Sequence, residues 1–226
     1  MSDESGHKRP EIMLDTGLAF FGAVVASVSH EMNNVVSIVD QTAGLLDDLI
    51  AGEKHGVPLS IERLEEAVKS VQRQTGRGLA LVKRLNRFAH SADENLIEFD
   101  INEALENLTA LTERLANLKR AALTFTPAPE ELLLRGNPFF LQQTVFTAVK
   151  IALTDIDREQ TVAVSCRRDG DAVAVELVSP HPLDPADSRF EGLRTIVAHM
   201  DADLQLEPAG GPATIRLTLR NATPAP

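Results

Sequence analysis

One histidine stands among small and uncharged residues in the stretch SVSHEMNNVV, which covers residues 27–36. His30 is followed directly by Glu31 and, one helical turn later, by Asn34. An imidazole is both a nucleophile and a proton carrier near neutral pH, and a carboxylate can accept a hydrogen bond from one ring nitrogen and leave the other free to attack. An amide one turn away can hold a water or a phosphoryl oxygen. These residue types therefore fit nucleophilic chemistry at His30, although an exposed helix histidine is more often an ordinary surface residue.

A metal site is the first alternative for the same residues. His30 and Glu31 begin like the His-Glu-x-x-His zinc motif, but Asn34 replaces the second histidine and no third ligand is apparent. The histidine itself therefore remains as the reactive group.

The position of His30 in the apolar pattern places it on an exposed face. It lies two residues from Val28 and two from Met32, so it is turned by about 200° from the apolar stripe of a helix. Residues at helical spacing around it are small or uncharged, whereas a solvated face normally carries Glu, Lys and Arg. We expect a docking surface for a protein partner, formed by Ser27, Asn33, Asn34, Ser37 and Gln41.

Two long helices must position this face. Apolar residues recur at steps of three and four from Leu14 to Leu49, which predicts a helix of about 35 to 40 residues. Residues 51–58 break the pattern, and a second helix follows the N-cap Ser60. The expected seams are Leu14, Leu18, Phe21, Val25, Val28, Met32, Val35, Val39, Leu46 and Leu49, then Ile61, Leu64, Val68, Val71, Thr75, Gly78, Val82, Leu85 and Ala89.

The two helices predict an antiparallel hairpin over residues 11–92, after a disordered polar tail over 1–10. Such a hairpin leaves one apolar stripe uncovered. A second copy can cover it by forming a four-helix bundle, so we expect a homodimer. The alternative is that the following domain covers the stripe within one monomer.

Residues 97–220 alternate between strand and helix patterns and predict an α/β sandwich, followed by a tail over 221–226. The expected fold class is therefore α+β: a long helical hairpin forming a dimeric four-helix bundle, followed by an α/β sandwich. The linker between them is expected near residues 91–96.

Composition excludes several classes of function. The net charge of −11 argues against binding to a phosphate backbone, and the absence of Trp and Tyr removes the usual platforms for stacking bases. No secretory signal or apolar span of about 18 residues is present, and the single cysteine cannot form an internal disulfide. We expect a cytoplasmic protein that binds neither nucleic acid nor membranes.

The residues Ser29-His-Glu-Met-Asn-Asn34 resemble the phosphoacceptor motif of bacterial sensor histidine kinases. The predicted hairpin is similar to the dimerisation and histidine-phosphotransfer domain of that family, and the sandwich resembles its ATP-binding domain. The resemblance implies that His30 is phosphorylated, that Glu31 assists as acid or base, and that Asn34 positions a water for dephosphorylation. Val35 stands where many members have proline, so the usual helix bend is in doubt.

The nucleotide-binding motifs of that family are replaced by other residues in this sequence. Its two asparagine positions hold Thr147 and Ile151, and an isoleucine cannot ligate magnesium. Residues 179–183, Ser-Pro-His-Pro-Leu, replace the Asp-x-Gly-x-Gly motif, and residues 184–191 contain no glycine where a glycine-rich lid is expected. We infer from the resemblance that the domain no longer binds ATP well.

The combination resembles the dimeric histidine phosphotransferases of phosphorelays, which are degenerate kinases. It implies that His30 exchanges phosphoryl groups with aspartates in receiver domains of response regulators or of a hybrid kinase. No cofactor of its own is expected, since the receiver supplies Mg²⁺. The alternatives are a weakly active kinase, a receiver phosphatase that uses Asn34 and water, and a non-catalytic adaptor that binds a receiver through the bundle.

Overall fold

A computed structural model describes residues 4–93, 96–200, 202–207 and 211–220. The chain divides into two compact units. One is a helical hairpin over residues 25–86, and the other joins residues up to 24 with those from 87 onward.

Two helices, α1 (Glu4–Lys54) and α2 (Ile61–Ser91), contribute residues 25–54 and 61–86 to the hairpin unit. Ser60 accepts a hydrogen bond from the backbone N–H of Arg63 and so caps the start of α2. The prediction of a disordered tail over residues 1–10 is wrong from Glu4 onward, because α1 already begins there. Extending an existing helix adds one hydrogen bond for each residue fixed, and this extends α1 through the polar residues. Residues 1–3 and 221–226 of the predicted tails lie outside the described residues.

The apolar seams of the hairpin are confirmed in part. Val28 and Val35 on α1 are buried as predicted, and so is Gly78 on α2. Val68 and Val82, however, are 51% and 43% exposed. The apolar stripe of α2 is wider than the surface that α1 can cover. One part of the stripe therefore faces α1, and the part with Val68 and Val82 is exposed.

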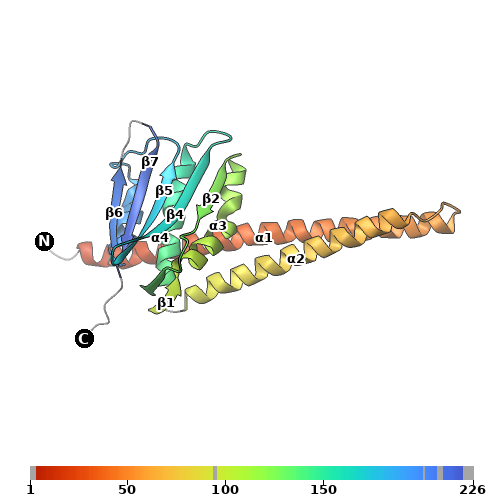
Figure 1. The fold of residues 1–226 in the computed structure, drawn as a ribbon, viewed down its shortest axis with the longest axis horizontal. Coiled ribbons are helices and arrows are strands. Elements are labelled where there is room, and N and C mark those ends of the chain that lie inside the picture. Colours follow the sequence, from red (N-terminus) through yellow and green to blue (C-terminus); the bar gives the residue numbers. More distant parts are fainter. Residues whose placement is uncertain (1–3, 94–95, 201, 208–210, 221–226) are drawn as a thin grey trace. The chain divides into compact units, whose positions relative to one another are not determined.

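The second unit is the expected mixed α/β fold (Figure 1). A five-stranded sheet has the order β2-β4-β5-β7-β6, with β2 parallel to β4 and the other pairs antiparallel, and β1 pairs antiparallel with β3. The elements are β1 (Ile97–Asp100), α3 (Ile101–Leu118), β2 (Ala122–Thr126), β3 (Leu133–Gly136), α4 (Pro138–Thr154), β4 (Thr161–Asp169), β5 (Ala172–Ser179), α5 (Arg189–Val197), β6 (Ala202–Glu207) and β7 (Ala213–Leu219).

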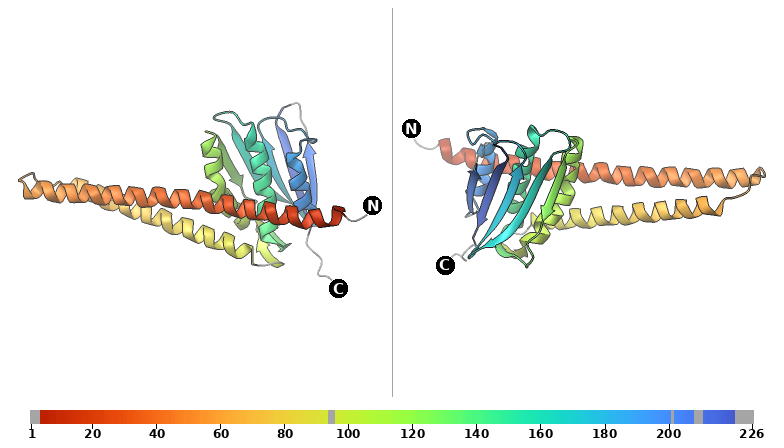
Figure 2. Two further views of the ribbon diagram at one scale, coloured as in Figure 1. Left: turned by 180° about the vertical axis from the view of Figure 1, so that it is seen from behind. Right: turned by 45° about the horizontal axis from the view of Figure 1, so that its top comes forward.

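Helices α3, α4 and α5 cover one face of the five-stranded sheet (Figure 2). Asp100 caps α3 by accepting from the Asn102 backbone N–H at 3.0 Å, and Asn137 caps α4 in the same way, with Pro138 in the first turn. Alternate residues of β7 are buried, as a sheet with one covered face requires. Cys166 of β4 is a core residue as predicted, and burial raises the pKa of its thiol.

The first part of α1 belongs to this unit rather than to the hairpin. Phe20 is 2% exposed, and its ring lies 4.8 Å from that of Phe146 and 5.1 Å from that of Phe88. The predicted seam is wrong here by one residue, because Phe20 and Val24 are buried in place of Phe21 and Val25. The prediction continued the apolar spacing of the hairpin into this segment. The segment instead packs against α4 and the end of α2, and this neighbour buries a different side of the helix.

This packing predicts that Phe20→Ala destabilises the second unit. Removing a fully buried phenylalanine costs about 3–5 kcal/mol in unfolding free energy. Urea unfolding followed by circular dichroism measures the loss. Leu118→Ala is the matched control, since Leu118 is 63% exposed and its truncation should change stability by about 0.5 kcal/mol or less. Equal losses for both variants would contradict the assignment of Phe20 to the core.

Candidate functional site

His30 is exposed on α1, near the end of the hairpin unit that is opposite to the loop between the two helices. Its Nδ1 lies 3.4 Å from Nδ2 of Asn34, which is one helical turn further along. A flip of the Asn34 side chain exchanges its NH2 group and its oxygen. Asn34 can therefore donate a hydrogen bond to Nδ1 through the NH2 group or accept one from a protonated Nδ1 through the oxygen. The structure thus brings two of the three predicted catalytic residues into contact and leaves the rest of the imidazole open.

Glu31 has a different partner from the one that its position beside His30 suggests. Its Oε2 accepts a hydrogen bond from Nη2 of Arg77 on α2 at 2.9 Å. The Glu31 side chain is only 17% exposed, because a turn of about 100° from His30 directs it toward α2. The carboxylate is therefore held next to the histidine by an arginine of the second helix.

Gly78 allows α2 to approach α1 at the level of this ion pair. A Cβ at this position would lie 3.4 Å from Cγ1 of Val35 and 3.7 Å from Cε of Met32. Arg77 is the residue before Gly78, and Glu31 is the residue before Met32. The contact between Gly78 and Met32 therefore places Arg77 within reach of Glu31. The close helix contact and the ion pair thus depend on one small residue.

The predicted docking surface is exposed at four of its five positions. Asn33, Asn34, Ser37 and Gln41 are all exposed. The prediction is wrong for Ser27, which is 2% exposed and whose Oγ has no hydrogen-bond partner among the described residues. Ser27 lies one turn before Glu31 and so shares the face that is turned toward α2.

Sequence reasoning missed Arg77 and underrated Gly78. Arg77 is a charged residue on a helix far from His30 in the chain, and nothing local marks it. Gly78, by contrast, occupies a seam position where larger apolar residues are usual, and that departure was a readable sign of a close helix contact.

The positions that correspond to the family's asparagines lie on α4. Thr147 donates its hydroxyl to the carbonyl of Gln143 at 2.8 Å, and Ile151 is 4% exposed. A cavity of about 310 Å³ beside them is also lined by Thr16 and Phe20 of α1. An aliphatic side chain offers no oxygen ligand, so these residues do not fit a magnesium-bound nucleotide.

The loop after β5 also differs from a nucleotide-binding turn. Ser179 is fully buried and donates to the carbonyl of His181 at 3.0 Å, and Leu183 is buried. The loop thus closes on itself through a serine, at the place where the sequence resemblance implies a carboxylate. Among the described residues, no group of three or more His, Cys, Asp or Glu side chains is placed to hold a metal ion.

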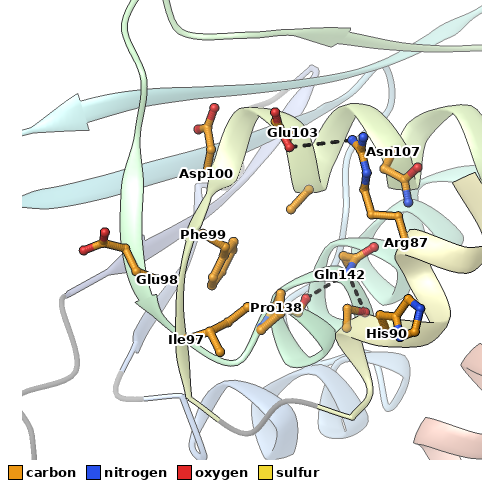
Figure 3. A pocket seen from close by; sticks show the side chains of 12 residues that line it. Arg87, His90, Ile97, Glu98, Phe99, Asp100, Glu103, Asn107, Pro138 and Gln142 are labelled. Atoms are coloured by element: carbon orange, nitrogen blue, oxygen red, sulfur yellow. Dashed lines mark hydrogen bonds and ion pairs between the residues drawn. The ribbon is translucent and has the colours of Figure 1, made fainter.

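A second cavity, of about 420 Å³, lies in the same unit at the end of α2 (Figure 3). Arg87 and Glu103 form an ion pair of 3.7 Å at its edge, and Gln142 donates to Ser91 at 3.0 Å and to the Pro138 carbonyl at 3.1 Å. Oε1 of Gln142, by contrast, is buried without a hydrogen-bond partner among the described residues. The cavity contains no residue of the hairpin unit and is not part of the His30 site.

No protein-family model and no curated protein matches this chain. Solved structures do match. The histidine kinase AdeS of Acinetobacter baumannii aligns over 86% of this chain and 98% of its own, with 12% identity and a TM-score of 0.50. The catalytic domain of histidine kinase ThkA, free of nucleotide, covers 57% of this chain and 97% of its own, with 13% identity and a TM-score of 0.50.

A structure of ThkA in complex with the response regulator TrrA covers 97% of this chain and 66% of its own, at 16% identity and a TM-score of 0.50. At these identities the likeness shows the fold alone. The fold of this chain is that of histidine kinases. No helix within the described residues is long and apolar enough to cross a bilayer.

The close contact at Gly78 generates a prediction with a matched control two residues away. Gly78→Leu should push the helices apart and lower the unfolding free energy by about 1–3 kcal/mol, as overpacking does. Gly76→Leu should instead be neutral or stabilise by up to about 1 kcal/mol, because a Cβ there meets nothing within 4 Å and leucine favours helix. Urea unfolding of both variants measures the difference. A Gly78→Leu protein as stable as Gly76→Leu would contradict the close contact.

Proposed function

We propose that this chain is a histidine phosphotransferase of a two-component phosphorelay, which moves phosphoryl groups between receiver-domain aspartates and His30. The observation that supports this best is an exposed imidazole with Asn34 beside it, on a long helical hairpin, in a chain with the histidine kinase fold. The sequence resemblance of the residues around His30 supports the same assignment.

The transfer step needs one unprotonated ring nitrogen. When the Asn34 amide is turned so that its oxygen accepts the Nδ1 proton, Nε2 is free to attack. Nε2 then forms a bond to phosphorus, the bond between phosphorus and the aspartyl oxygen breaks, and the aspartate carboxylate leaves. Transfer onward reverses these changes. The Mg²⁺ that neutralises the developing charge would come with the receiver.

Glu31 would hold or take up a proton during this exchange. Its carboxylate belongs to the residue next to His30 and is fixed by Arg77 at 2.9 Å. The neutral residues Asn33, Ser37 and Gln41 would contact the receiver, since they are exposed around the histidine. Asn33, Ser37 and Gln41 would thus bind and orient the receiver, whereas the bonds to phosphorus would form and break at His30.

We further propose that the donor is not ATP. Ile151 supplies no ligand for magnesium, and the segment of α1 around Phe20 packs against α4 next to it. A chain with an accessible histidine and without its own phosphoryl source would have to be charged by another protein.

Radiolabelled phosphate tests this function directly. Receiver domains encoded by the same genome, each charged with labelled acetyl phosphate and then purified, should transfer label to this chain, whereas labelled ATP alone should not. His30→Gln should abolish the labelling, and His55→Gln should not, because His55 lies in the exposed loop after α1.

Label from ATP alone would point to a kinase. A His30→Gln protein that still dephosphorylates the receiver at the wild-type rate would point to a phosphatase. If the chain binds a receiver but no phosphoryl transfer is detected, the result would point to a non-catalytic adaptor.

The proposed homodimer generates a separate prediction. Val68 and Val82 are two heptads apart on α2 and are both half exposed, so they lie in line on the uncovered stripe. The double variant Val68→Glu, Val82→Glu should sediment as a monomer of 24.5 kDa, and the wild type as a dimer. Leu118→Glu is the control, since Leu118 is exposed outside the hairpin and should leave the dimer intact. A monomeric wild type would contradict the four-helix bundle.

A further inference from the structure

The cavity at the end of α2 is large enough for a small ligand. Its volume of about 420 Å³ lies within the range of about 300–1,000 Å³ that is usual for small-molecule sites. Its walls come from the last turn of α2, from β1, from α3 and from the start of α4 (Figure 3). All of its lining residues belong to the second unit, so the cavity is formed within one compact body.

Part of the cavity wall is apolar. Ile97 and Phe99 stand two residues apart on β1, so their side chains leave the same face of the strand. Ala104 on α3 and Pro138 on α4 also line the cavity, and neither has a polar side chain. A ligand with an apolar body can therefore bury surface here, and an aromatic ring can pack against that of Phe99.

Gln142 supplies a hydrogen-bond acceptor that lacks a partner, and its side chain faces the cavity (Figure 3). The residue is 2% exposed, and its Nε2 donates to Oγ of Ser91 and to the Pro138 carbonyl. The Ser91 hydroxyl itself donates to the Phe88 carbonyl at 2.6 Å, so it can only accept from Gln142, and this fixes the orientation of the amide. Oε1 has no partner within the described ranges, and a buried acceptor of this kind is unfavourable until a ligand or a water donates to it.

The charged groups at the cavity favour a cation. Three carboxylates line it: Glu98, Asp100 and Glu103. Arg87 is the one permanent cation among the described lining residues, and its pair with Glu103 leaves both side chains more than 60% exposed, so the pair opens at little cost. His90, also at the cavity, lies 3.7 Å from the carboxylate of Asp93. The excess of negative charge attracts an ammonium group and disfavours an anion.

We infer that this cavity binds a small organic ammonium ion with an apolar body. The N–H groups of the ligand donate to Oε1 of Gln142 and to the carboxylate of Glu103, and its apolar part lies against Ile97 and Phe99. The ring of Phe99 adds attraction for the positive charge. The site is separate from His30, and the inference does not depend on the proposed function.

The cavity of about 310 Å³ beside Thr147 has the opposite charge and serves as an internal comparison. Lys150 and Arg189 line it, and its described lining residues include no carboxylate. An ammonium ion is repelled there and should bind at the end of α2 instead.

Three probes that share one ring test the class of ligand. Benzylamine carries an ammonium group, benzyl alcohol a neutral donor and benzoate an anion. Benzylamine should bind with a dissociation constant of about 1 mM, which the efficiency of small ligands allows, and benzyl alcohol should bind about tenfold more weakly. Benzoate should not bind in this cavity. Titrations followed by ¹H–¹⁵N NMR measure all three and show whether the signals of residues 97–104 shift.

Variants locate the site. Ala104→Leu fills the cavity and should weaken benzylamine at least about tenfold. Ala110→Leu is the matched control, because Ala110 is half-buried like Ala104 on the same helix but does not line the cavity. Gln142→Met removes the acceptor and should also weaken benzylamine about tenfold. Glu103→Gln changes an exposed residue that the fold tolerates and should weaken it about threefold.

Three results would overturn the inference. The first is benzylamine at about 10 mM leaving the signals of residues 97–104 unchanged, which would mean that the cavity holds water alone. The second is equal binding of all three probes, which would remove the selectivity for an ammonium ion. The third is benzylamine binding that Ala104→Leu and Ala110→Leu leave equally strong, which would place the probe elsewhere on the protein.

Discussion

The close packing of α2 against α1 at Gly78 is the constraint on which the site depends. It places Met32 and Val35 toward the second helix and thereby turns His30 outward, and it brings Arg77 to 2.9 Å from Glu31. A larger residue at position 78 would separate the helices at the level of the histidine. The outward position of His30 and the placement of its neighbouring carboxylate therefore both follow from the contact of Gly78 with the side chains of Met32 and Val35.

The second unit bears on the same proposal through the residues that stand at its candidate nucleotide positions. Its sheet and helices have the histidine kinase fold, and we propose that Ile151 and the loop after β5 provide no ligands for a nucleotide. Phe20 of α1 packs against α4 on the same side as the altered positions. A fold whose stability comes from apolar packing survives the loss of surface chemistry, since the core and the site use different residues.

Much of this could be predicted from the sequence, because strong periodicity and turn residues encode local structure. Both long helices, the alternation of strands and helices in the sandwich and the exposure of His30 were predicted. The start of α1, the burial of Phe20 in place of Phe21 and the burial of Ser27 were not. Each of these depends on which neighbour packs against a helix, and one sequence does not state that. The Arg77–Glu31 pair was missed for the same reason, since 46 residues separate its partners.

The central claim is that a receiver, and not ATP, places a phosphoryl group on His30. The most direct measurement is tandem mass spectrometry at neutral to alkaline pH, which locates the phosphoryl group after the chain is mixed with charged receiver domains in the absence of ATP. The account predicts an acid-labile phosphoryl group on the peptide that contains residues 27–36, at His30 and nowhere else. A phosphoryl group at another residue, or one that arises only when ATP is added, would contradict it.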